Sequence, residues 1–369
     1  MRALGTNGRY PRRRTAAVVG LGTTAALVLG ACAQEGSTPD TVTGGELGDF
    51  AATTDYLSGV ARAAEEQSFR MAVDMTMRGS SPGEDEFEAS GQMMTGEVDG
   101  ETSSLVVDMG PMMDDLRPGE SVDGDLTMTM VTDGEVMYVQ APLFGTLAEM
   151  ALSEGATRSD LGPLAALSEL DEGEWGRVDL EGLTMAEVAQ TTGAQGVSAD
   201  VFVDMAAAGE DVEDLGTEEI RGVETRGLGA TSTFEDMILA QGITLDEFRD
   251  QFPTSVPGEF SEGEVDTVID AMLDLEIPLE VWVDDDDNVR RVTLALDMSE
   301  LMSGLADLDP SAAGVEMSMD MSMDLFDYGD DSIQIAVPTE STDGTNEFLE
   351  LMEGGGFGGA SGGPALGST

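Results

Sequence analysis

Few side chains in this chain of 369 residues could carry out covalent chemistry. It contains 74 aspartates and glutamates, one cysteine and no histidine, and all 16 of its basic residues are arginines. Without histidine there is no Ser-His-Asp or Cys-His pair, and without lysine there is no Schiff base or P-loop lysine. We therefore expect no enzymatic activity, no cofactor and no metal centre built on histidine.

The acidic side chains set the electrostatics of the whole molecule. A formal net charge of −58 repels phosphate backbones, so we expect no nucleic-acid partner. The excess of acid would serve either as a docking surface for a cationic partner or as a solvated coat. A carboxylate pair for glycoside hydrolysis is compatible with this composition, but nothing singles out one pair among 74 acids.

The single cysteine, Cys32, ends a segment with the organisation of a secretory signal. Residues 1–14 carry five arginines and no acid, and residues 15–31 form an uncharged run rich in Ala, Val, Leu and Gly. This run is shorter than the roughly 20 residues of a membrane-spanning helix, although a permanent anchor helix is the alternative. The arginine cluster at residues 12–14 leaves export through either the Sec or the Tat route open.

The residues Leu29, Gly30, Ala31 and Cys32 resemble a bacterial lipobox, in which the cysteine is acylated and becomes the first residue of the mature protein. The resemblance implies a signal peptide over residues 1–31 and a diacyl or triacyl anchor at Cys32, with palmitate as one such acyl group. Two acyl chains give stable attachment to a membrane. We expect a flexible tether over residues 32–50, a folded domain over 51–340 and a Gly-rich disordered tail over 341–369.

Methionines recur at every second position in several segments. In residues 315–326, apolar residues alternate with Glu, Ser and Asp, so one face of a strand would meet an apolar interior and the other face would meet water. Methionine adapts to irregular apolar partners, so these rows could line a cavity for acyl chains. Ordinary core packing and a thioether site for Cu(I) are the alternatives. The candidate cavity residues are Met71, Met75, Met77, Met128, Met130, Met137, Leu294, Leu296, Met317, Met319, Met321 and Met323.

The elements that position these residues are mainly strands. Alternating patterns predict strands at the following residues: 69–77, 86–95, 102–109, 125–141, 175–179, 218–232, 279–283, 289–298, 315–326 and 332–337. Asp133 and Gly134 predict the turn of a hairpin within 125–141, and Pro338 is expected to end the sheet. Helical spacing of apolar residues predicts helices at residues 51–67, 143–152, 161–170, 183–191, 245–251 and 265–273. Together they predict an α+β fold with an antiparallel sheet of about ten strands and helices on one side.

The acidic run of residues 284–287, followed by Asn288, has two interpretations. Its carboxylates could bind Ca²⁺, but the run lacks the alternating ligands, the Gly and the final Glu of an EF-hand loop. Since it lies between two predicted strands, we interpret it as a hairpin turn.

The order of these features resembles the LppX/LprG-type lipoproteins of mycobacteria and other actinobacteria, which share a half-barrel with the LolA and LolB carriers. The resemblance rests on Cys32, the early helix and the strand at 69–77. It also rests on the hairpin at 133–139 and on the segments at 175–179, 216–225 and 327–338. It implies a curved antiparallel half-barrel with helices on the concave side and an apolar cavity between them. The chain departs from the family in its length, its acidic loops and its lack of lysine, so contact with anionic head groups would fall to its few arginines.

These expectations combine into one functional hypothesis. The protein would be anchored through Cys32 on the extracytoplasmic face of the plasma membrane, where it would bind an acyl-chain lipid or lipoglycan and carry or present it. The alternative is a non-enzymatic interaction lipoprotein with a packed core and an acidic docking surface. The sequence leaves open whether the strands form one half-barrel or two smaller sheets.

Overall fold

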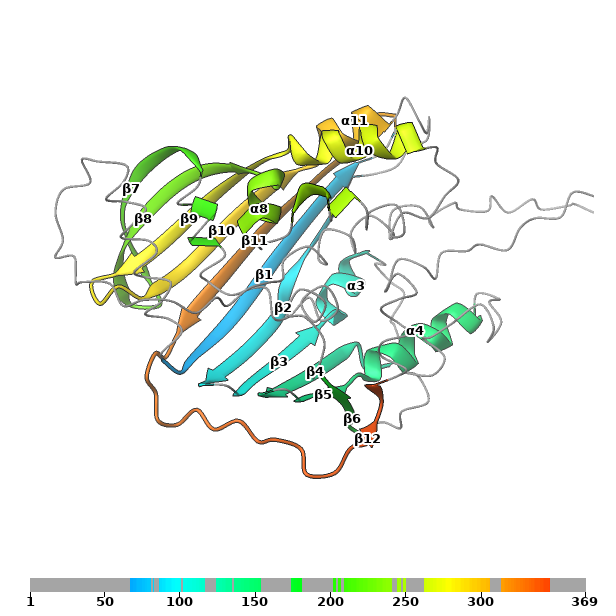
Figure 1. The fold of residues 1–369 in the computed structure, drawn as a ribbon, viewed down its shortest axis with the longest axis vertical. Helices are drawn as coiled ribbons and strands as arrows, with labels where there is room; N and C mark the ends of the chain where they lie inside the picture. The colour runs from blue at the N-terminus through cyan, green and yellow to red at the C-terminus, as the bar shows by residue number, and fades with distance from the viewer. Residues whose placement is uncertain are drawn as a thin grey trace, which may run out of the picture.

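In a computed structural model of the chain, the alternating segments form one continuous sheet of twelve strands, curved as a half-barrel. Figure 1 shows this sheet with its helices gathered on one side. The structure describes residues 67–80, 82, 86–100, 102–116, 124–134, 136–153, 174–180, 202–203, 205–206, 209–240, 244–246, 248–249, 262–305 and 313–345.

The strands follow the alternating pattern of the sequence closely. In chain order they are β1 (Phe69–Ser80), β2 (Phe87–Asp99), β3 (Thr102–Asp108), β4 (Thr127–Asp133), β5 (Val136–Gln140), β6 (Gly176–Asp179), β7 (Glu210–Ile220), β8 (Val223–Thr233), β9 (Glu276–Asp284), β10 (Val289–Asp297), β11 (Glu316–Phe326) and β12 (Thr342–Asp343). In space their order is β12-β6-β5-β4-β3-β2-β1-β11-β10-β9-β8-β7.

The first and last long strands meet in the middle of the sheet. β1 pairs with β11 antiparallel over eleven residue pairs, from Arg70 opposite Phe326 to Ser80 opposite Glu316. This pairing joins the meander β1 to β6 to the meander β7 to β11, so the strands form one sheet and not two. The other neighbouring strands are also antiparallel, except β12, which pairs with β6 in parallel.

Helices cover the apolar face of the sheet. They are α3 (Gly110–Leu116), α4 (Pro142–Ser153), α8 (Phe234–Ala240), α10 (Glu262–Leu273) and α11 (Ser299–Leu305). α8 begins with a reciprocal capping box, in which the Asp236 backbone N–H donates to the Thr233 hydroxyl and the Thr233 backbone N–H donates to the Asp236 carboxylate. The α+β fold with helices on the concave side is therefore confirmed.

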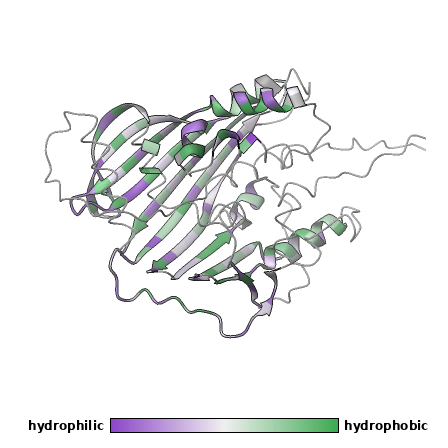
Figure 2. Cartoon of the chain, viewed as in Figure 1, coloured by the Kyte–Doolittle hydropathy of each residue, from purple (hydrophilic) through white to green (hydrophobic). Residues whose placement is uncertain are grey.

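The side chains of each strand divide between two faces, because successive residues in a strand point to opposite sides. Figure 2 shows apolar and polar residues alternating along the central strands. We call the face that packs against the helices the inner face and the opposite one the outer face. Buried side chains of α8 and α10, such as Ile238 and Ile269, lie in one cluster with Met321 and Met323 of β11.

Three details of the sheet differ from the expectation. Twelve strands form where about ten were expected, residues 332–337 are not a strand, and Pro338 does not end the sheet. β11 already has β1 on one edge and β10 on the other, so the chain that follows it finds no free edge there. The chain after β11 runs instead past the strand ends to the edge of the sheet at β6, where Thr342 and Asp343 pair with this strand.

Most other predicted elements are confirmed. The hairpin turn at Asp133 and Gly134 joins β4 to β5, and the pair of strands predicted at 218–232 is β7 and β8. The helices predicted at 143–152 and 265–273 are α4 and α10, and residues 245–246 and 248–249 are helical.

Several predicted features lie outside the described residues. They are the signal peptide at 1–31, Cys32 and the tether to residue 50, the helices at 161–170 and 183–191, residues 51–66 of the helix predicted at 51–67, and residues 346–369 of the tail predicted at 341–369. Residue 67 is not helical, and the start of the predicted tail forms β12. Among the helices of the described ranges, none is long and apolar enough to cross a membrane.

Candidate functional site

The strand registers bring the twelve candidate cavity residues together on the inner face. Across the centre of the sheet, Met75 of β1 lies opposite Met321 of β11, and Met321 lies opposite Leu294 of β10. In the other direction, Gly96 of β2 connects Met71 to Leu105, which lies opposite Met130 of β4. The apolar residues that recur at every second position in four separate segments therefore form one apolar surface.

Nine of the twelve residues are fully packed in this structure. Their exposed fractions range from 0 to 7%, and they lie in clusters formed by the sheet and the helices. In this structure these side chains are part of the hydrophobic core, which agrees with ordinary core packing, the alternative to a ligand cavity. They are Met71, Met130, Met137, Leu294, Leu296, Met317, Met319, Met321 and Met323.

The remaining three, Met75, Met77 and Met128, are only half-buried. With two half-buried neighbours, Met94 of β2 and Val107 of β3, they lie along the borders of three hydrophobic clusters of the described residues. Met75 and Met77 pack against the first and third clusters, Met94 packs against the first and second, and Val107 and Met128 pack against the second. Met94, Val107 and Met128 are consecutive neighbours across β2, β3 and β4. We call these five residues the methionine seam, a half-buried part of the apolar surface that the registers join.

The sequence prediction missed Met94 because β2 contains an irregularity. The register between β1 and β2 shifts between Val73 and Asp74, so that Met94 pairs with Val73 while Gln92 pairs with Asp74. The extra residue, Met93, lets both methionines of the doublet reach the inner face, where Met93 is buried beside α3. Two adjacent methionines in an alternating strand were the only signal for this bulge in the sequence.

Helix α3 forms one border of the methionine seam. It lies directly on β2, where a Cβ atom added at Gly91 would be 2.6 Å from the Cβ atom of Pro111. Met112 of α3 packs with Ala89 and Met93, and Met75 and Met77 lie against this cluster. Gly91 therefore allows the helix to approach the sheet closely enough to flank the seam.

A polar hollow of about 540 Å³ lies at the end of β3 and the start of β4, beside α3. It is lined by Asp108, Asp114, Asp125 and Thr127, among others. Asp108 and Thr127 face each other across β3 and β4, and each is the chain neighbour of a seam residue. Asp108 accepts a hydrogen bond from the Gly110 backbone N–H at 2.9 Å, and Asp125 accepts one from the Thr127 N–H at 2.9 Å.

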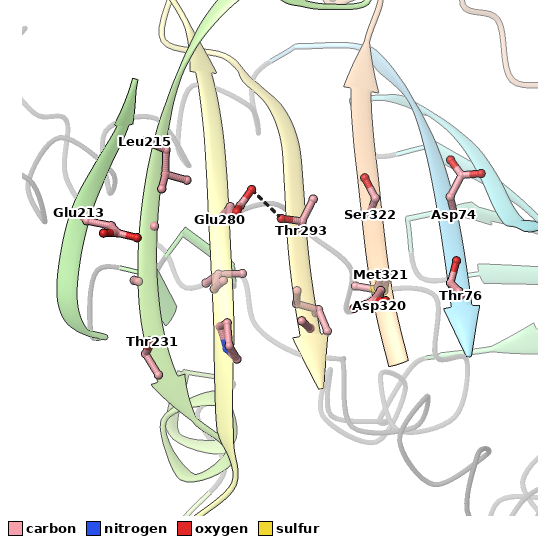
Figure 3. A pocket seen from close by; sticks show the side chains of 16 residues that line it. Asp74, Thr76, Glu213, Leu215, Thr231, Glu280, Thr293, Asp320, Met321 and Ser322 are labelled. Atoms are coloured by element: carbon pink, nitrogen blue, oxygen red, sulfur yellow. Dashed lines mark hydrogen bonds between the residues drawn. The ribbon is translucent and has the colours of Figure 1, made fainter. Parts of the chain in front are cut away.

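The outer face carries a second hollow, a groove of about 400 Å³. Figure 3 shows its floor, formed by outer-facing side chains such as Thr76, Thr293 and Ser322. The edge strand β7 forms one wall, because two bulges bring Glu213 and Leu215 close to Gly229 of β8. Two of the twelve candidate residues, Leu294 and Met321, are among the residues that line this groove, although both are buried and pack in the hydrophobic cluster of the inner face.

Carboxylates dominate the walls of this outer groove. Glu280 accepts hydrogen bonds from the Thr293 hydroxyl and from the Trp282 indole N–H, each at 3.2 Å. Asp74 and Glu213 make no hydrogen bond or ion pair within the described part of the chain. The groove could therefore accept cations or hydroxyl groups.

The acidic run at residues 284–287 forms the hairpin turn between β9 and β10, as predicted. The buried Asp284 carboxylate accepts hydrogen bonds from the Asn288 and Asp286 backbone N–H groups, each at 2.9 Å, and from Arg290 at 2.5 Å. Burial alone would raise the pKa of Asp284, but these hydrogen bonds outweigh it and hold the pKa below its usual value. One of the carboxylates that the Ca²⁺ interpretation would use is thus held by hydrogen bonds within the turn itself. Within the described ranges no cluster of acids and Cys has the arrangement of a metal site.

The arginines of the described part are all committed to ion pairs. Arg70 and Arg78 occupy outer-facing positions of β1 and pair with acids of neighbouring segments. Arg291 and Arg221 share the buried Asp324, with Nε to carboxylate distances of 2.6 and 2.9 Å. The other four, which also pair with acids, are Arg177, Arg226, Arg249 and Arg290.

Comparison with known proteins returns lipoproteins of the kind that the sequence resembles. LprF from Mycobacterium bovis is 12% identical, and the match covers 79% of this chain and 98% of that chain with a TM-score of 0.37. The lipoprotein LppX from Mycobacterium tuberculosis is 10% identical, with 78% and 99% covered and a TM-score of 0.32. A LolA superfamily protein from Nitrosomonas europaea is 9% identical, with 78% and 94% covered and a TM-score of 0.20.

Similarity at this level of identity concerns the fold alone. No protein-family model and no curated protein matches the chain.

Proposed function

We propose that this protein is an extracytoplasmic lipoprotein that binds an acyl-chain lipid or lipoglycan on its inner face and carries or presents it in the cell envelope. The observation that carries the proposal is the methionine seam, a half-buried apolar strip along the borders of three packed clusters. Binding would require no covalent step, since apolar burial supplies the affinity at roughly 0.8 kcal/mol for each buried methylene.

The absence of charge on the inner face supports this function. In a chain with 74 acids, the register-joined inner positions of β10, β11, β1, β2, β3 and β4 carry no charged side chain. Methionine has three rotatable bonds and a polarizable sulfur, so it can fit acyl chains of variable shape. A purely structural core would gain more rigidity from branched side chains at the same positions.

Membrane attachment through an acylated Cys32 belongs to the same proposal. The lipobox-like residues and the position of the only cysteine support it. Replacing Cys32 by Ser is expected to abolish incorporation of labelled palmitate into the protein. Labelling that survives this substitution would contradict the proposed anchor.

Polar substitutions in the methionine seam test the binding site. Changing Met94 and Met128 together to Gln keeps the side-chain length but makes the seam polar, and half-burial lets the new amides reach water. We expect at least a tenfold loss of affinity for a fluorescent fatty acid, because tenfold corresponds to only about 1.4 kcal/mol.

A matched control for this experiment is Met150→Gln on α4. Met150 is also half-buried, but it belongs to none of the three clusters around the seam. Its variant should bind the probe like the unmodified protein. Equal binding by all three proteins would argue against the seam as the site.

The outer groove favours a second function, that of a lipoprotein whose acidic face docks a cationic partner. Asp74 and Glu213 line this groove and make no hydrogen bond or ion pair in the described part of the chain, although the charge of Asp74 acts on Arg291. Under this function a lysine-rich peptide would bind the full chain and would bind an Asp74→Asn, Glu213→Gln variant more weakly. It would bind an Asp331→Asn, Glu340→Gln variant, with two exposed acids changed elsewhere, as tightly as the unmodified protein.

A further inference from the structure

The third hydrophobic cluster, the one beside α3, consists almost entirely of methionine. Five of its six members in the described part of the chain are methionines, although methionine accounts for only 24 of the 369 residues. The other two clusters combine methionine with many Leu and Val side chains. A structural core gains rigidity from branched side chains, so this concentration of thioethers points to a use of the sulfur itself. The members are Ala89, Met93 and Met112, which are buried, and Met75, Met77 and Met109, which are half-buried.

Three elements bring these methionines together. Met93 is the extra residue of the bulge in β2, which places it on the inner face beside α3. Met109 and Met112 are three residues apart at the start of α3, where the Met109 carbonyl accepts a hydrogen bond from the Met113 N–H at 3.0 Å. Residues at this spacing lie on the same face of a helix, so both side chains reach the cluster. Two methionines of β1 border the cluster from the sheet.

The packing of α3 on β2 fixes the positions of these side chains in advance. Figure 1 shows α3 next to β2. Near the start of the helix, Pro111 lies directly over Gly91. One turn later, the Asp115 carboxylate accepts a hydrogen bond from the Ser90 backbone N–H at 3.0 Å. Ligands that are held in place before binding lose less entropy when they bind.

The donor atoms of this cluster suit a soft monovalent metal ion. Thioether sulfur selects Cu(I), whereas carboxylates suit Mg²⁺ and Ca²⁺, and imidazole suits Zn²⁺. The chain has no histidine and only one cysteine, in the lipobox-like segment, so methionine is its main source of soft ligands. The strong negative charge of the molecule attracts cations. Half-burial of Met109 leaves the cluster partly open to water, so an ion could enter it.

We propose that Met93, Met109 and Met112 bind one Cu(I) ion through their thioether sulfurs, with Met75 and Met77 of β1 beside it. The ion binds and leaves as Cu(I), so no electron transfer is involved. The three ligands lie outside the methionine seam. This metal site therefore goes beyond the proposed lipid-binding function and does not depend on it.

Titration with Ag⁺, an air-stable ion with the same charge and a closed d shell, tests this proposal. The full chain is purified in a mild detergent, labelled with ¹³C at its methionine methyl groups and titrated with silver nitrate. The buffer lacks chloride and contains excess Mg²⁺, which occupies the carboxylates. The methyl signals of Met93, Met109 and Met112, assigned from single Met→Leu variants, should shift to an end point at one Ag⁺ per chain. Cu(I), added in the absence of oxygen, should move the same signals. Shifts confined to other methionines, or no end point at one ion, would overturn the proposal.

Replacement of two ligands by Leu locates the site. Met93→Leu with Met112→Leu keeps the volume and the apolar character of the cluster, a change that cores tolerate. We expect the affinity for Ag⁺ to fall roughly tenfold or more, because only one of the three ligands remains. The matched control is Met130→Leu with Met137→Leu, since both residues are buried in the second cluster. The control should bind Ag⁺ like the unmodified protein. Equal losses in both variants, or in neither, would show that the third cluster does not bind the ion.

Fatty-acid binding separates this site from the proposed function. The Met93→Leu, Met112→Leu variant retains all five residues of the methionine seam, so it should bind the fluorescent fatty acid like the unmodified protein. The seam variant Met94→Gln, Met128→Gln retains all three proposed metal ligands and should bind Ag⁺ unchanged. A loss of Ag⁺ binding by the seam variant as large as that of the cluster variant would overturn the assignment of the three ligands.

Discussion

At the scale of single residues, stability depends on how the few cations are shared among many carboxylates. Asp324 is buried on the outer face of β11, and its two oxygens accept hydrogen bonds from Arg291 and Arg221. Arg221 also lies 4.0 Å from the centre of the Phe326 ring, a favourable cation–π arrangement. Removing this carboxylate would leave two guanidinium groups without their shared acceptor.

We therefore expect Asp324→Asn to destabilise the protein by about 2 kcal/mol at pH 7. Burial alone would raise the pKa of Asp324, but hydrogen bonds from the two arginines outweigh it and lower the pKa below its usual value. The unfolded chain thus takes up this proton at a higher pH than the folded chain. The stabilisation is complete above about pH 4 and is lost as the pH falls through the folded-state pKa.

Urea unfolding of the two proteins at pH 7 and at pH 2.5 measures this effect. The difference in unfolding free energy should be present at pH 7 and should shrink at pH 2.5. Asp327→Asn is the control, because Asp327 is an exposed partner of Arg70 and exposed ion pairs contribute about 0.5 kcal/mol. A constant difference for Asp324→Asn across this pH range would contradict the assignment.

The sequence predicted which residues face inward better than it predicted which of them are open. Period-two alternation assigned Met75, Met77 and Met128 to the apolar face together with nine residues that prove to be packed. Whether an inward residue is covered depends on where α3 and α10 dock, and alternation within a strand carries no information about that. The sequence analysis did not name Met94, because one bulge in β2 shifts the register and so reverses which of its residues face inward.

Among the helices and strands, the packing of α3 on β2 forms one border of the methionine seam. The contact depends on Gly91, because a methyl group there would overlap with Pro111. Gly91→Ala is expected to displace α3 and to cost about 1–3 kcal/mol, as overpacking does in cores. Hydrogen exchange of the α3 amides should accelerate along with the loss of stability.

Gly145→Ala provides the matched control for this substitution. Gly145 lies inside α4, and no atom lies within 4 Å of an added Cβ there. The change should stabilise the protein by about 0.5–1 kcal/mol through helix propensity. If Gly91→Ala also stabilised the protein, the close contact between α3 and β2 would be wrong.

The elements that the sequence did predict are those with strong local signals. Asp133 and Gly134 mark a hairpin turn, and twelve residues of uninterrupted alternation mark β11. Residues 332–337 alternate too, with Ile333 buried, yet they form no strand, because both edges of β11 are taken by β1 and β10. Whether a strand has a free edge depends on the assembled sheet, and a local sequence pattern contains no information about it.

At the scale of the whole molecule, the two faces of the sheet have different roles. The outer face holds the ion pairs and the acidic groove, while the inner face holds the apolar clusters and the methionine seam. Period-two alternation predicted this division, and the resemblance to a lipoprotein family implied the half-barrel. The sequence could not predict that β1 and β11 join the two meanders, because residues that far apart in the chain share no local signal.

Lipid retained during purification tests most directly whether the inner face binds lipid. The full chain is purified in a mild detergent from a lipid-containing bacterial host, and its mass is measured under native conditions before and after solvent extraction, which leaves covalent acyl groups in place. We predict a stoichiometric noncovalent lipid that extraction removes and that the seam variant Met94→Gln, Met128→Gln retains poorly. A protein that is free of lipid as isolated, and remains free after incubation with lipid, would contradict lipid binding by the inner face.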